Sequence, residues 1–292
     1  MDKTQQSPDA ATLRVYFSRF LRNESRLRVP LLSALQRLTQ RGLDGVVFGG
    51  ALRDLMATGP SAAPRDVDVV VDGASIKELE GVFQDVLIRK TRFGGLHLNV
   101  QGWMIDVWPL SETWALKEFS IAGRDFEALT RTTFLNVEAA TISLSVKRGA
   151  RQVHARGFFE AVGNRTLDIN LEENPFPELA AVRTLITAYK LNYALSRRLA
   201  RYVIHYTHRT PIEQLVQLQF SHYGFAKFNR DIIHSWARAL RSQVGTQSLI
   251  RVPVRLPAQL PLWTQSKPAA SRAIVAQEPK SETVSDLRAP RC

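Results

Sequence analysis

Three aspartates in two apolar segments have the residue type and the spacing of a divalent-metal site. Asp66 and Asp68 open a run of β-branched residues, and Asp106 lies between Ile105 and Val107 in a later segment. Side chains two residues apart in a strand point to the same face, so the carboxylates of Asp66 and Asp68 should lie close together. Like charges held that close need a cation, and carboxylate oxygens suit Mg²⁺ better than zinc. We therefore predict that Asp66, Asp68 and Asp106 form one metal-binding and catalytic cluster.

Three carboxylates around two ions can carry out in-line phosphoryl or nucleotidyl transfer. The pair Gly49-Gly50 lies between an apolar run and helix-forming residues. Backbone N–H groups at a helix N-terminus favour a phosphate, and glycines allow it to approach closely. We predict that Gly49 and Gly50 cradle the β and γ phosphates of a nucleoside triphosphate. A non-catalytic interpretation is also open for each aspartate. Asp66 and Asp68 could simply be solvated residues at the start of a strand, and Asp106 could be a hairpin residue whose side chain faces water.

The elements that must position these residues follow from hydrophobic periodicity and breakers. Two helices are expected within residues 13–38, interrupted at Pro30. The predicted elements that follow are a strand at 45–48, a helix at 51–56, a strand at 66–71, a helix at 75–87, a hairpin of strands at 96–100 and 103–108, and helical stretches at 178–205 and 212–240.

We expect four parts along the chain, with a mixed five-stranded sheet in the second. These are an N-terminal helical segment at 1–24, an α/β head at 25–150, a helical neck at 151–245 and a basic, partly disordered tail at 246–292.

The charge of the chain favours a polyanionic partner. The formal net charge is +12, and residues 151–245 contain 13 Lys and Arg against 7 Asp and Glu. A basic surface attracts nucleic acid through counterion release, and an anionic membrane is the competing interpretation. No apolar run is long enough for a membrane helix, and the N-terminus lacks the pattern of a signal peptide. We therefore expect a cytoplasmic protein without a membrane partner. Its single cysteine, Cys292, excludes an internal disulfide, and the oligomeric state is left open.

The same residues resemble a known family. The segment Gly49-Gly50-Ala51-Leu52-Arg53-Asp54, followed by Asp66-Val67-Asp68, resembles the Gly-Gly-x-Val-Arg-Asp and Asp-x-Asp motifs of CCA-adding tRNA nucleotidyltransferases and bacterial poly(A) polymerases. Phe93-Gly94-Gly95 is similar to the Phe-Gly-Thr turn of that family. The resemblance covers residues 40–205 and is strongest at 49–72. It implies an α/β (α+β) fold, with a polymerase-β-like nucleotidyltransferase head of mixed sheet followed by an α-helical neck.

The resemblance also implies nucleotide-binding residues, and the chain departs from the family among them. Besides Gly49 and Gly50, the matching positions are Arg53, Arg131, Asn136 and Arg183. Arg53 could instead brace the loop together with Asp54, and Arg131 and Arg183 could be surface charges. Thr132 replaces the aspartate of the family's Arg-Arg-Asp-Phe-Thr-x-Asn motif, and of Glu-Asp-x-x-Arg the arginine alone survives. In the family that Asp/Arg pair selects the base, so the nucleotide preference of this chain stays open.

Several further residues could have a functional role, but each also has an ordinary structural explanation. Arg198 and His205 have a spacing seen in small helical ribonuclease domains, but basic helices produce such matches by chance, so we favour a solvent-exposed face. His97 could touch a nucleotide or be an ordinary strand residue. Trp103 and Trp108 are expected in the core, with base stacking as the alternative.

Together these features predict Mg²⁺-dependent transfer of a nucleoside monophosphate from a nucleoside triphosphate to an acceptor hydroxyl. The expected acceptor is an RNA 3′ end, first of all that of tRNA. One alternative is transfer to a protein or a small molecule, and the other is a nucleic-acid-binding module without catalysis.

Overall fold

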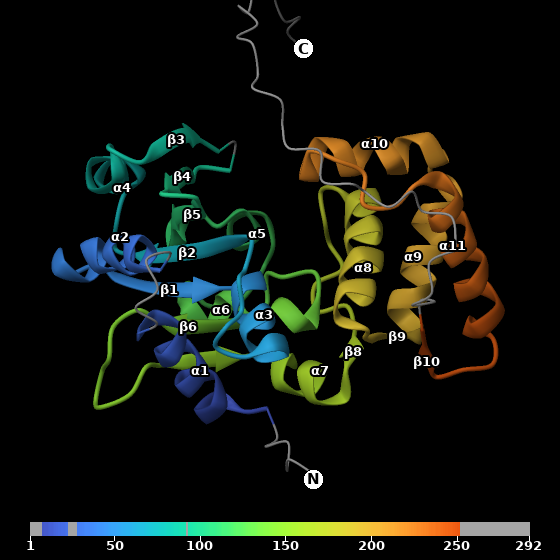
Figure 1. Ribbon diagram of the computed structural model, residues 1–292, viewed down its shortest axis with the longest axis horizontal. Coiled ribbons are helices and arrows are strands. Elements are labelled where there is room, and N and C mark those ends of the chain that lie inside the picture. Colours follow the sequence, from blue (N-terminus) through green and yellow to red (C-terminus); the bar gives the residue numbers. More distant parts are fainter. Residues whose placement is uncertain (1–7, 23–27, 92, 252–292) are drawn as a thin grey trace, which may run out of the picture. The chain divides into compact units, whose positions relative to one another are not determined.

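A computed structural model describes residues 8–22, 28–91 and 93–251, which belong to one compact unit. The unit is built on a seven-stranded sheet in the order β3-β4-β5-β2-β1-β6-β7 (Figure 1). The strands are β1 (Asp44–Phe48), β2 (Asp66–Asp72), β3 (Leu87–Lys90), β4 (Leu96–Val100), β5 (Trp103–Pro109), β6 (Ala140–Ser143) and β7 (Val153–Ala155). β2 and β5 run parallel, whereas the other neighbouring pairs of this sheet are antiparallel. The predicted mixed sheet is thus confirmed.

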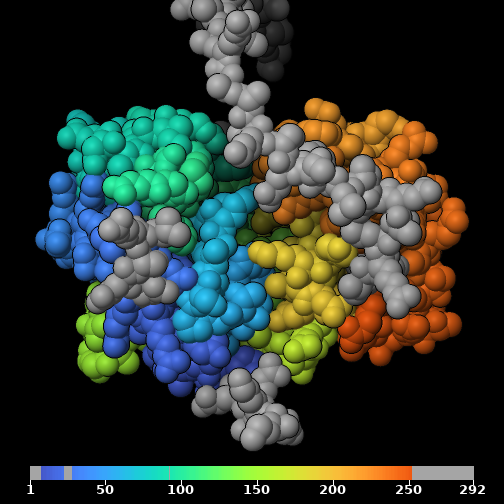
Figure 2. All heavy atoms as spheres, in the orientation of Figure 1, coloured from blue at the N-terminus to red at the C-terminus, as the bar shows by residue number. Residues whose placement is uncertain are grey.

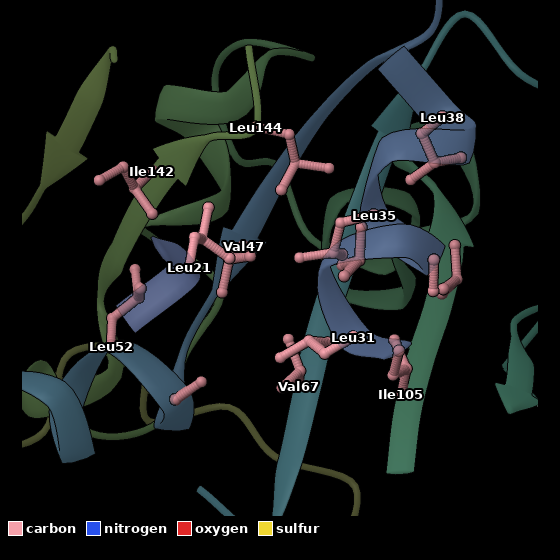
Figure 3. Packing of buried hydrophobic residues seen from close by; sticks show 14 of the residues in the cluster. Leu21, Leu31, Leu35, Leu38, Val47, Leu52, Val67, Ile105, Ile142 and Leu144 are labelled. Atoms are coloured by element: carbon pink, nitrogen blue, oxygen red, sulfur yellow. The ribbon is translucent and has the colours of Figure 1, made fainter. Parts of the chain in front are cut away.

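Helices cover one face of the sheet and bury the larger core with it. They include α1 (Ala10–Arg22), α2 (Val29–Gln40), α3 (Gly50–Thr58) and α4 (Ile76–Phe83). Figure 3 shows leucines of α2 near Val67 of β2 and Ile105 of β5. Since alternate side chains of a strand point to opposite faces, Asp66, Asp68 and Asp106 lie on the other face.

The prediction of five strands was wrong, because the sheet has seven. Strands β3, β6 and β7 have only three or four residues each, which is too short for alternation to stand out in a sequence. The predicted hairpin is confirmed as β4 and β5. Its turn is Gln101-Gly102, with φ values of 49° and 93°.

Four longer helices lie in the second half of the described chain (Figure 1). They are α8 (Pro177–Leu191), α9 (Arg197–Arg209), α10 (Ile212–Tyr223) and α11 (Arg230–Val244). Each of the two predicted helical stretches is divided, the first after Asn192 and the second at Gly224, where φ is 54° and 77°. Three short strands pair beside the helices, namely β8 (Thr166–Leu167), β9 (Ala194–Ser196) and β10 (Leu249–Ile250).

Short helical elements connect these parts: η1 (Leu110–Glu112), α5 (Trp114–Glu118), α6 (Phe126–Leu129), η2 (Asn136–Glu138) and α7 (Phe158–Asn164). The two helices expected around Pro30 are confirmed as α1 and α2. The predicted boundaries between head, neck and tail stay predictions, and the tail from residue 252 onward lies outside the described residues. No helix among the described residues is long and apolar enough to span a membrane.

Candidate active site

The parallel pairing of β2 and β5 brings the predicted carboxylates together. Asp68 pairs in register with Asp106, and Asp66 lies two residues earlier on the same face. On the other side of Asp68 lies Phe48 of β1, and on the other side of Asp106 lies His97 of β4. A row from His97 to Phe48 therefore crosses four strands, with two carboxylates at its centre.

The surroundings of Asp68 disfavour its negative charge. Its pKa is raised from an ordinary value of 3.8 to about 7, first by burial and then by the charges of Asp106, Asp66 and Glu138, against a lowering effect of Arg183. A cation next to these oxygens would stabilise the charged form and lower the pKa again. At neutral pH, Asp68 without such a cation is about half protonated.

The two outer carboxylates have partners of their own. Both oxygens of Asp66 accept hydrogen bonds from Arg65, with 2.6 Å between Nε and Oδ1. Nδ1 of His97 lies 2.5 Å from Oδ1 of Asp106. Arg65 thus brings a positive charge to the cluster, and His97 fixes one oxygen of Asp106.

The donor set suits a hard divalent cation, although the side chains are engaged elsewhere. In the part of the chain that the structure describes, no group of three or more His, Cys, Asp or Glu side chains has the arrangement of a metal site. Asp66 would have to exchange Arg65 for an ion, whereas Asp106 contacts His97 through Oδ1 only. The chemistry fits, since the carboxylates share one face and the neighbouring charges of Asp106 and Asp66 add to burial in raising the pKa of Asp68.

The glycine pair forms the turn between β1 and α3. Gly49 has a φ of 74°, which side chains rarely allow, and a Cβ there would lie 3.6 Å from Oδ2 of Asp68. Its N–H donates to the carbonyl of Ala140 at 3.2 Å. A phosphate would therefore be bound by the N–H of Gly50 at the start of α3 rather than by that of Gly49, while the N–H groups of Leu52 and Arg53 donate to the carbonyl of Gly49.

A cavity of about 640 Å³ adjoins the three carboxylates and both glycines. Its other wall comes from α8, which contributes Arg183 and Lys190, and from the end of α10 with the loop after it, which contribute Tyr223 and Lys227. The site therefore combines residues from both halves of the described chain.

A cluster of ion pairs joins the two walls. Nε of Arg53 donates to Asp54 at 3.0 Å, and its Nη1 donates to Glu138 of η2. From α8, Lys190 binds Asp54 at 2.8 Å, and Arg183 lies 3.8 Å from Glu138. Figure 2 shows α3 in light blue beside α8 in yellow. Arg53 therefore has the structural role that we gave as an alternative, since it pairs with Asp54 and holds neighbouring elements together. It also lines the cavity.

The remaining nucleotide-binding candidates differ in their placement. Arg183 lines the cavity, whereas the structure does not bring Arg131 and Asn136 to it. Nη1 of Arg131 donates to the carbonyl of Ala122 at 3.2 Å. Oδ1 of Asn136 accepts from the backbone N–H of Asp168 at 2.9 Å, which joins the start of η2 to the segment after β8.

The weaker candidates have structural partners as well. Arg198 of α9 pairs with Glu172 at 2.7 Å, and His205 lies 3.4 Å from Arg209 on the same helix. All four residues are exposed. A ribonuclease-like pairing of Arg198 with His205 is therefore not formed.

Both tryptophans of β5 pack against core residues. Trp103 meets Phe20 edge-on, with 6.0 Å between the ring centroids. Trp108 meets Phe48 at 6.4 Å and donates from Nε1 to Oγ1 of Thr113 at 3.1 Å. Since Trp108 also lines the cavity, its ring is available to a ligand there.

Several residues of the site were missed in the sequence. Arg65 could have been found, because it directly precedes Asp66. Glu138, Lys190, Tyr223 and Lys227 carry no motif of their own, and it is the fold that brings them to the cavity.

Solved structures of tRNA nucleotidyltransferases have this fold. A tRNA nucleotidyltransferase complexed with a primer tRNA and an incoming ATP analog matches with a TM-score of 0.52 and 20% identity, over 72% of this chain and 60% of that one. The Thermotoga maritima CCA-adding enzyme complexed with tRNA matches with a TM-score of 0.51 and 17% identity, over 70% and 48%. A tRNA-processing enzyme in an apo form matches with a TM-score of 0.51 and 19% identity, over 71% and 58%.

No protein-family model matches the sequence, and no curated protein matches it either. At these identities, the likeness shows the fold. The chain shares the fold of these CCA-adding enzymes, and the expected fold class of a mixed α/β sheet followed by helices is confirmed. It spans about half to three fifths of the length of these solved structures.

Proposed function

We propose that the protein transfers a nucleoside monophosphate from a nucleoside triphosphate to the 3′ hydroxyl of an RNA, with tRNA as the first candidate. The observation that supports this is the register of Asp68 with Asp106 on parallel strands, beside a glycine turn and inside a cavity. The fold adds support, since one of the solved structures with this fold is a tRNA nucleotidyltransferase complexed with a primer tRNA and an incoming ATP analog. A cytoplasmic location, where both substrates are found, is part of the proposal.

In this reaction the 3′ oxygen of the acceptor forms a bond to the α phosphorus, and the bond from that phosphorus to the bridging oxygen breaks. Pyrophosphate leaves with the electron pair. Asp66, Asp68 and Asp106 would hold Mg²⁺, which supplies activation of the hydroxyl and charge neutralisation on the leaving group. Asp106 accepts the proton of the hydroxyl, and His97 positions Asp106 through the 2.5 Å contact.

The start of α3 orients the phosphates, and two cations of the cavity wall supplement it. The N-terminal end of a helix favours negative charge, and Gly50 begins α3. Arg183 and Lys190 lie on the opposite wall, where they would attract a triphosphate.

The test is incubation with Mg²⁺, each α-labelled nucleoside triphosphate in turn and total cellular RNA. Wild type should label RNA with a preferred base, whereas Asp66→Ala/Asp68→Ala should lose at least about a hundredfold in rate. Asp72→Ala is the matched control, since this exposed aspartate ends the same strand outside the cavity. If the double variant labelled RNA as wild type does, the proposed site would be wrong.

A second acceptor class deserves a separate readout, because the base-selecting residues differ from the family pattern. The cavity wall has Leu179 and Ala180 where the family motif has Glu and Asp. Pyrophosphate release without label in RNA would indicate transfer to a protein or a small molecule. If neither label nor pyrophosphate appeared, a binding module without catalysis would be the better description.

A further inference from the structure

Aromatic and basic side chains gather where the end of α10 meets the cavity. Tyr223, the last residue of α10, and Lys227 line the same cavity as Asp66. Phe225, which lies between them in the chain, leaves 50% of its surface exposed. Nζ of Lys227 lies 4.8 Å from the ring centroid of Tyr223 and 6.0 Å from that of Phe225. The two rings and the ammonium group therefore form one cluster, which we call the ledge.

Arg65 connects the ledge to the carboxylates. Its guanidinium carbon lies 5.2 Å from the ring centroid of Tyr223, and its nitrogens bind Asp66. A group seated on the ledge is therefore one side chain away from the reacting centre.

The composition around the ledge favours a nucleic acid. The segment from Phe220 to Arg230 contains no acidic residue, and Phe220 on α10 is also 47% exposed. Proteins bind single strands by stacking bases on aromatic rings beside basic side chains that attract the phosphates. An exposed phenyl ring next to an ammonium group provides both interactions.

The position of Phe225 separates the ledge from the triphosphate site. Tyr223 and Lys227 line the cavity, whereas Phe225 does not, so its ring extends the site beyond the cavity that would hold the nucleotide. The second reactant of a transfer reaction needs a place of this kind, open to solvent and next to the cavity.

We propose that Tyr223, Phe225 and Lys227 stack and hold the terminal base of a single-stranded RNA 3′ end, which directs its 3′ hydroxyl toward the carboxylates. This inference rests on the proposed function and adds the acceptor subsite to it. A recessed or blunt 3′ end has no unpaired terminal base, so it is not an acceptor that the ledge can hold.

Binding of short RNA labelled with 2-aminopurine tests the ledge without metal or nucleotide. Stacking quenches this fluorescent base, so wild type should quench a 3′-terminal label much more strongly than a 5′-terminal one. Phe225→Leu keeps an apolar side chain without a ring and should weaken binding about tenfold. Phe225→Trp should bind as wild type does. Ile88→Ala is the matched control, since Ile88 on β3 is also 50% exposed.

The proposed role of the ledge would be wrong if Phe225→Leu bound the RNA as tightly as wild type does. It would also be wrong if the 3′-terminal and 5′-terminal labels were quenched equally. Failure of the ledge and failure of the proposed function give different results. If RNA is labelled in the transfer assay and Phe225→Leu leaves the KM for RNA unchanged, the ledge is wrong and the transfer activity stands. If 3′ quenching depends on Phe225 while no RNA is labelled, the ledge binds RNA and the proposed transfer is wrong.

Discussion

Asp68 lies between Asp106 and Phe48 across the sheet, so one neighbour repels its charge and the other excludes water from it. That the side chains of Asp66 and Asp68 share a face follows from their spacing alone. Their proximity to Asp106 cannot be inferred from the spacing, because it depends on β2 and β5 being neighbouring strands that pair in register. The contact of His97 with Asp106 likewise depends on the pairing of β4 with β5, whereas Arg65 directly precedes its partner Asp66 in the sequence.

The raised pKa of Asp68 has a consequence for stability. Protonated Asp68 is favoured in the folded protein, so its contribution to stability is present below the ordinary pKa and is lost as pH rises toward about 7. Without metal, wild type should lose on the order of 2 kcal/mol of unfolding free energy relative to Asp68→Asn between about pH 4 and pH 7. Chemical denaturation in a chelator at several pH values measures this difference.

Magnesium should reverse the effect, because it binds the charged form. We expect Mg²⁺ to raise the melting temperature of wild type more at pH 8 than at pH 5, and to leave that of Asp68→Asn nearly unchanged at both. Parallel pH profiles of the two proteins in a chelator would contradict the assigned pKa.

At the scale of elements, α3 and α8 are held together by a buried carboxylate with two basic partners. Asp54 is 6% exposed and binds both Arg53 and Lys190, which keep its pKa below the ordinary value although burial alone would raise it. The sequence motif predicts Arg53 and Asp54 as a pair, but Lys190 lies far along the chain. Helix α8 was predicted from its hydrophobic periodicity. Its end at Asn192 was not predicted, because a single residue with a positive φ does not change the hydrophobic periodicity of the sequence.

Asp54→Asn should therefore lower the unfolding free energy at neutral pH by about 2 kcal/mol, since it removes a buried carboxylate that accepts hydrogen bonds from both Arg53 and Lys190. Asp85→Asn is the matched control, because Asp85 is exposed and pairs with Arg37 at the surface. That variant should lose less than about 1 kcal/mol. Urea denaturation of both variants measures the difference, and equal losses would show that the α3–α8 contact is not a stability determinant.

For the molecule as a whole, the charge excess of the helical half appears as a basic groove. A hollow of about 380 Å³ between α9 and α11 is lined by Arg201, Arg209 and Arg241 with two histidines, and its described lining has no acidic residue. The composition of the sequence predicted a polyanion partner, but only the packing of α9 against α11 places these charges on one surface.

Removing two of these charges should change how RNA binding depends on salt. For Arg201→Gln/Arg241→Gln we expect weaker binding at low salt, and a slope of log affinity against log salt that is smaller by roughly 1.4. Arg37→Gln/Lys147→Gln removes the same charge from ion-paired positions outside the groove and should keep the wild-type slope. Filter binding at several salt concentrations tests this, and equal slopes for the two double variants would exclude the groove from RNA binding.

The fold class was predictable because the glycine pair and the aspartates carry a resemblance, and because long helices have strong periodicity. The number of strands could not be predicted, since β3, β6 and β7 are too short to show a clear alternation in the sequence. The placement of Arg131 and Asn136 was not predictable either, because their motif departs from the family at Thr132 and its loop is fixed by contacts with Ala122 and Asp168.

The two-walled cavity also has a consequence for how the protein is made on the ribosome. The carboxylate row is complete once β5 has been synthesised, but the facing wall comes from α8 and from the loop that contains Lys227. Chains fold from the N-terminal side as they emerge, so a nascent chain displays its three aspartates before the cavity exists. Until Lys227 has left the ribosome, such a chain has its carboxylates without the facing wall of the cavity, so the proposed nucleotide site is completed only late in translation.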